Sequence, residues 1–166
     1  MLSAMQVGHW LVEFLNGYER DGFRKSGDHL ITNERSLLKI LKFFSLAKFP
    51  NLQPEISAYN GGRIDFGFDD LGLEIVVKNK LGAGNPIVGQ NASEMVKLRK
   101  FHGRSCLAPI DMEKDSNVNL DRVIAADRGH SLVKRNHAQA RPTTILAIAR
   151  GDEHYDLKKY NLRASK

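Results

Sequence analysis

The chain has 166 residues, 42% of them hydrophobic and 27% charged, with 25 lysines and arginines against 19 acidic residues. This size and composition predict one globular domain, residues 1–166, and argue against a second independent core. The net charge of +6 favours nucleic acid, an acidic protein or an anionic membrane face as partner, and the single cysteine, Cys106, excludes an internal disulfide or a cysteine-based zinc site. The sequence shows no secretory signal and no run of roughly 20 apolar residues, so we expect a cytoplasmic protein without a membrane segment.

Two helices are predicted before any strand. Over residues 4–20 the large apolar side chains recur at helical spacing, from Trp10 to Tyr18. A second helix is predicted over 33–49, because Thr32 or Asn33 can cap its first turn and Pro50 cannot continue it.

Three strands are predicted next, over 55–59, 63–68 and 73–78. The first two are joined by the turn Asn60-Gly61-Gly62, which tolerates positive φ angles. A helix over 91–102 follows, and the apolar run 143–149 predicts a central strand buried on both faces and lying beside the third strand. Residues 103–118 have no clear pattern, and the charged tail is compatible with a helix from His154.

This order of elements resembles the core of the PD-(D/E)XK, or restriction-endonuclease-like, nuclease superfamily. The residues that carry the resemblance are Asp65 on the second strand and Lys78 at the end of Leu73-Glu74-Ile75-Val76-Val77-Lys78 on the third. The resemblance implies an α/β fold with a central mixed sheet flanked by helices. It also implies that an acid on the second strand and an acid-x-Lys on the third converge on a divalent metal.

The third strand departs from this family pattern. An acid is expected two residues before the lysine, where this chain has Val76, and the available acid is Glu74. Because side chains alternate along a strand, Glu74 lies on the same face as Lys78 but about 6.6 Å from the expected place. Either the metal site is shifted, or the site is degenerate and does not cut.

The resemblance assigns roles to named residues of this chain. Asp65 and Glu74 would bind Mg²⁺ or Mn²⁺, which accept carboxylate oxygens and can activate water beside a phosphate. Lys78 would assist the attacking water, and Glu34 on the second helix would support the site. An alternative without catalysis is that Glu74 and Lys78 form an ion pair on the solvent face of a sheet.

Nucleic-acid contacts are expected from the basic stretch that follows the third strand. Lys97, Arg99, Lys100 and Arg104 would meet phosphates, although a solvated helix face explains them equally well. The leading hypothesis is therefore a metal-dependent DNA endonuclease, and the resemblance implies that it acts as a homodimer. The alternatives are a catalytically degenerate module that binds nucleic acid or a protein, and an inhibitor or immunity-type domain.

Overall fold

The computed structural model describes residues 2–20, 34–57, 62–78, 97–98, 101, 103–112, 143–151 and 154–161. These residues form two helices and six strands, in the order α1 (Ala4–Arg20), α2 (Glu34–Lys48), β1 (Leu52–Ser57), β2 (Arg63–Phe68), β3 (Leu71–Lys78), β4 (Arg104–Asp111), β5 (Thr143–Arg150) and β6 (Tyr155–Asn161). The predicted α/β class with a central mixed sheet is confirmed.

The six strands form one sheet in the order of the chain, β1-β2-β3-β4-β5-β6. Strands β1, β2 and β3 are antiparallel neighbours, β3, β4 and β5 are parallel, and β6 returns antiparallel to β5. Parallel neighbours need a crossover connection. Residues 79–103, which include Lys97, Leu98 and Phe101, therefore carry the chain from one end of the sheet back to the other.

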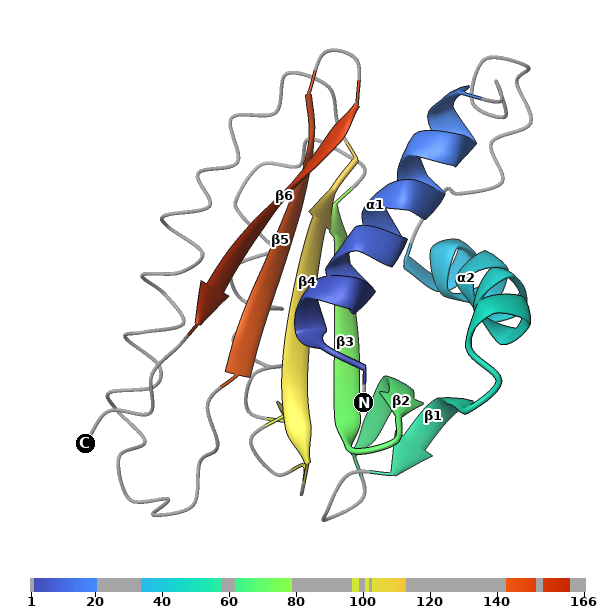
Figure 1. Ribbon diagram of the computed structural model, residues 1–166, viewed down its shortest axis with the longest axis vertical. Coiled ribbons are helices and arrows are strands. Elements are labelled where there is room, and N and C mark those ends of the chain that lie inside the picture. The colour runs from blue at the N-terminus through green and yellow to red at the C-terminus, as the bar shows by residue number, and fades with distance from the viewer. Residues whose placement is uncertain are drawn as a thin grey trace.

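Both described helices pack on one face of the sheet, which we call the helix face (Figure 1). Alternate strand residues point to this face because side chains alternate along a strand. The large apolar side chains of α1 and α2 meet them in a single core, to which β3 contributes Leu71, Leu73 and Ile75. Each fully buried side chain of this kind stabilises the fold by about 1.5–3 kcal/mol. Neither described helix combines the length and apolarity needed to cross a bilayer.

Several sequence predictions agree with the structure. The helix over 4–20 has the predicted bounds, 33–49 appears as Glu34–Lys48, and 63–68 as Arg63–Phe68. Strand β5 lies inside the sheet, next to the edge strand β6, and is buried on both faces over residues 145–148, as its apolar sequence predicts. The strands expected at 55–59 and 73–78 begin earlier, at Leu52 and Leu71. Most of the predicted helix over 91–102 lies outside the described residues; residues 97–98 are helical, whereas Phe101 is not.

Two predictions about the second half of the chain were wrong. The strand at 143–149 does not lie beside the third strand, because β4 is inserted between them. The region from His154 is the edge strand β6 and not a helix. Both errors come from strands whose own sequences lack an apolar alternation, so only their neighbours in the sheet identify them.

Replacing Gly8 on α1 tests the close approach of this helix to the sheet. A Cβ at Gly8 would lie 2.7 Å from Cδ2 of Leu157 and 3.3 Å from Cδ2 of Leu146. We expect Gly8→Ala to destabilise the protein by about 1 kcal/mol, since crowding outweighs the better helix propensity of alanine. In a Leu157→Ala background the same change should become stabilising. Urea unfolding measures both effects, and an equal effect in the two backgrounds would contradict the crowding.

Candidate functional site

Buried polar side chains of the sheet gather on the face opposite to the helices, which we call the polar face. By strand alternation these are Glu74 on β3, Ser105 and Asp111 on β4, and Thr143 on β5, each at most 4% exposed. The Ser105 and Thr143 hydroxyls lie 2.9 Å apart and share a hydrogen bond, which accounts for their burial. Glu74 and Asp111 are therefore two buried carboxylates on the polar face, which makes this face the candidate for a functional site.

Strands β2 and β3 separate at the two predicted acids. Their pairing runs from Phe68–Leu71 to Phe66–Leu73 and stops there, although both strands continue. Beyond that point an Asp65 carboxylate oxygen accepts a hydrogen bond from the Ile75 amide at 2.8 Å. The carboxylate thus takes the place of a ladder carbonyl. The next opposed pair in this register would be Asp65 and Glu74, so the two acids lie on adjacent strands at the point where the pairing stops.

Glu74 is the most deeply placed of the predicted site residues. Its side chain is 2% exposed, and one carboxylate oxygen lies 2.6 Å from the Lys97 ammonium, which is 26% exposed. A buried carboxylate is costly without a nearby positive charge or hydrogen-bond donors. Lys97, predicted to contact phosphate, therefore also supplies the counter-charge of the candidate site.

Lys97 is followed by two buried apolar residues, of which Phe101 packs on the polar face. Leu98 is 1% exposed and Phe101 is 5% exposed. Phe101 lies over Gly72 of β3, where an added Cβ would come within 3.0 Å of the ring. Gly72 lies two residues before Glu74 on the same face. The absence of a side chain at Gly72 therefore lets this segment approach the sheet next to the buried carboxylate.

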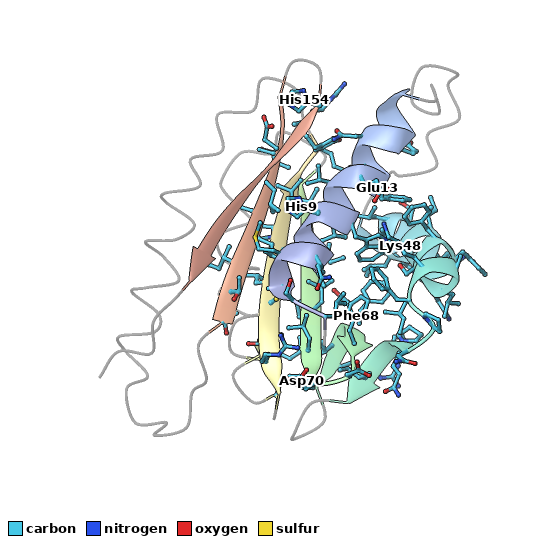
Figure 2. All side chains as sticks on the ribbon, viewed as in Figure 1. His9, Glu13, Lys48, Phe68, Asp70 and His154 are labelled. Atoms are coloured by element: carbon cyan, nitrogen blue, oxygen red, sulfur yellow. The ribbon has the colours of Figure 1, made fainter. Side chains whose placement is uncertain are left out.

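Asp70, in the turn between β2 and β3, binds Arg104, which is the first residue of β4 and follows the segment of Lys97 and Phe101 in the chain. Its carboxylate accepts two hydrogen bonds from Arg104, at 2.7 and 2.8 Å, and Arg104 also donates to the Leu2 carbonyl at 2.9 Å. This pairing raises the pKa of the Arg104 guanidinium. Figure 2 shows Asp70 at the end of the sheet near the N-terminus of α1. Arg104 is thus engaged in a bidentate contact within the fold, and its predicted contact with phosphate stays a prediction.

The remaining predicted site residues are only partly described. Lys78 is the last residue of β3, and alternation places it on the same face as Glu74. Glu34 is the first residue of α2, which packs on the helix face, whereas Asp65 and Glu74 lie on the polar face. Arg99 and Lys100 lie outside the described residues. The roles predicted for these four side chains stay predictions.

A groove of about 400 Å³ opens beside the site. Its lining consists of Gln53, Pro54, Glu55, Ile56, Gly67, Asp69 and Phe101. Glu55 has a φ of 53° within β1, which turns Ile56 across Gly67, where an added Cβ would lie 2.7 Å from Ile56 Cδ1. Positive φ at a residue other than glycine is uncommon and is often found near functional sites. Gly67 lies two residues from Asp65 on the same face, so the groove adjoins the candidate site.

Asp111, and the role of Lys97 beside Glu74, were not identified from sequence. Asp111 is 3% exposed and pairs in register with Lys78. It was missed because β4 was not recognised, although an acid ending an apolar stretch was a usable signal. The role of Lys97 beside Glu74 had no sequence signal, because the two residues are joined only by the crossover.

The donor set fits a magnesium-type ion held mainly by water and phosphate oxygens. Asp65 and Glu74 offer two carboxylates, and Mg²⁺ commonly takes one or two from a protein. No group of three or more potential ligands among His, Cys, Asp and Glu occurs in the described part of the chain. The described residues therefore contain no metal site in which three or more such side chains coordinate the ion.

Comparison with known proteins yields one weak similarity. No protein-family model matches the chain, and no curated protein matches its sequence. A solved structure of Pyrococcus furiosus SfsA in complex with Ca²⁺ is similar at a TM-score of 0.31 and 9% sequence identity, over 75% of this chain and 60% of that chain. The chain thus spans less than two thirds of the length of that structure. A TM-score this low does not assign the chain to a family.

Proposed function

We propose that the protein is a metal-dependent endonuclease that hydrolyses DNA phosphodiester bonds at Asp65 and Glu74. The observation that carries the proposal is the separation of β2 and β3 where these two acids oppose each other, with Glu74 buried on the polar face. Burial of the Glu74 carboxylate opposes folding, because a charge loses its hydration in the interior. A buried carboxylate at this position is therefore a candidate functional group.

Asp65 and Glu74 would hold Mg²⁺ or Mn²⁺. The ion, when bound, would polarise the phosphate and lower the pKa of a water molecule. Lys78, on the same face of β3, would offset negative charge that develops on the phosphate. The groove beside Gly67 gives the substrate a concave approach to the acids, and the net charge of +6 favours a polyanion.

A catalytically inactive nucleic-acid-binding module is the second candidate. The position at which the resembled superfamily has its acid is occupied by Val76, which is fully buried. In addition, Lys97 already neutralises Glu74 at 2.6 Å. A site closed in this way could bind nucleic acid through its basic surface without cutting it.

A cleavage assay separates the two candidates. With Mg²⁺ or Mn²⁺, we expect the wild-type protein to cut plasmid or linear DNA, and Asp65→Ala and Glu74→Ala each to lower the rate by about 100-fold or more, since each removes a ligand of the ion. Lys78→Ala should slow cleavage without weakening metal binding.

Asp156→Ala is the matched control. Asp156 is an exposed acid on β6 that pairs at the surface with His154 at 3.1 Å, so its removal should leave cleavage unchanged. Cleavage that survives Asp65→Ala would reject this assignment. DNA that is retained in a gel-shift assay but never cut would select the inactive module, and light scattering would test the predicted homodimer.

A further inference from the structure

We propose that Lys97 is a cation that a divalent metal must displace from Glu74, so that the ammonium closes the site in the metal-free protein. The inference rests on the proposed metal site at Asp65 and Glu74 and adds a residue that the family pattern does not supply. Lys97 is a positioning residue for Glu74, and once released it becomes available to a phosphate oxygen.

The first argument is the electrostatic requirement of Glu74. Its carboxylate is 2% exposed and lies within 2.6 Å of the Lys97 ammonium, whereas the Lys97 side chain reaches solvent with 26% of its surface. A buried charge whose oppositely charged partner is removed is strongly destabilising, because the attraction that offset its lost hydration is gone. Either the ammonium or a metal ion can meet this requirement, and both compete for the same oxygen atom.

The second argument is that the described residues near Lys97 are fixed in the fold, whereas the Lys97 ammonium lies on a partly exposed side chain. Leu98 and Phe101 are buried, Phe101 packs over Gly72, and Arg104 is held by the Asp70 carboxylate. The backbone that carries Lys97 is thereby kept beside the site when the ion pair breaks. A lysine side chain has a flexible stem and a compact charge, so it can leave Glu74 and stay within reach of a bound phosphate.

A second lysine–glutamate ion pair, Lys48–Glu13, differs from Lys97–Glu74 in the burial of its side chains. Lys48 and Glu13 join α2 to α1 at 2.7 Å (Figure 2), but these side chains are 44% and 65% exposed. Water can solvate both of those charges, so the pair contributes little to stability and does not compete with a ligand. The two pairs have nearly the same length and differ in burial, which makes Lys48 the natural control.

The experiment is thermal unfolding of the full chain in increasing Mn²⁺, with Lys97→Met and Lys48→Met compared with wild type. Without metal, Lys97→Met should melt well below wild type and Lys48→Met close to it. We expect half-maximal stabilisation of Lys97→Met at a Mn²⁺ concentration about tenfold lower than wild type, because the ion no longer competes with the ammonium. DNA cleavage by Lys97→Met should be slower in spite of this tighter binding.

Lys97→Arg keeps the test decisive if Lys97→Met does not fold. A guanidinium can hold a carboxylate through two hydrogen bonds, so this variant should fold and need about tenfold more Mn²⁺ than wild type. An unchanged Mn²⁺ midpoint in either Lys97 variant overturns the inference, and if wild type still cuts DNA the proposed nuclease stands. If Mn²⁺ stabilises no variant and wild type does not cut, both the inference and the proposed function fail.

Discussion

Gly103→Ala is expected to destabilise the protein by about 3 kcal/mol or more, because the new methyl group would overlap a backbone atom. A Cβ at Gly103 would lie 1.9 Å from the Asp70 carbonyl oxygen and 2.8 Å from the Phe101 ring. The Asp70 backbone belongs to the turn between β2 and β3, which Arg104 also clamps. Neither neighbour can move aside without disturbing the sheet.

Urea unfolding followed by Trp10 fluorescence measures this effect, and Gly151→Ala is its control. At Gly151 the nearest atom to an added Cβ is the His154 carbonyl oxygen at 3.1 Å, so a small backbone adjustment suffices. We expect the control to cost less than about 1 kcal/mol. Equal midpoints for the two variants would show that the Asp70 turn is not packed against Gly103.

Trp10→Ala is expected to cost about 4 kcal/mol, a value typical of large aromatic residues removed from a core. Trp10 is 1% exposed, and its ring lies edge-on to Phe49 at 5.4 Å and to Phe68 at 6.0 Å between centroids. This aromatic cluster joins α1 to β2 and to Phe49, the residue that follows α2. Its loss would separate the first helix from the strand that carries Asp65.

Trp10→Phe separates the ring from its polar atom. The indole Nε1 is buried and has no hydrogen-bond partner in the described part of the structure. Phenylalanine removes this unsatisfied donor, and we therefore expect a loss of only about 1–2 kcal/mol. Circular dichroism in urea is suitable, because the chain has a single tryptophan. A Trp10→Phe variant as unstable as Trp10→Ala would show that the indole N–H is satisfied after all.

Local sequence was enough to identify α1, α2 and β2. The helices carry apolar side chains at a spacing that matches one helical face, and Pro50 stops the second helix. The alternation of side chains along a strand likewise predicted that Glu74 and Lys78 lie on one face of β3. These features depend only on neighbours along the chain, so the sequence by itself determined them.

Strands β4 and β6 were decided by the tertiary structure. Pro109 argues against a central strand because proline cannot donate a ladder hydrogen bond. The pairing of β4 with β5 is nonetheless interrupted between Leu107–Ile145 and Ile110–Ile148, which accommodates the proline. Strand β6 contains Lys158 and Lys159 and lies at the edge of the described sheet, where charged residues discourage further pairing.

Some residues of the candidate site were predicted from sequence, and others were identified only from the structure. Asp65 and Glu74 were found from sequence, because both lie on short strands joined by local turns. The partner of Glu74, Lys97, lies across a crossover connection, and Asp111 reaches the same face only through a parallel pairing with Lys78. Contacts of this kind depend on how distant segments pack, which no local periodicity encodes, so only the tertiary structure decided which charges meet on the polar face.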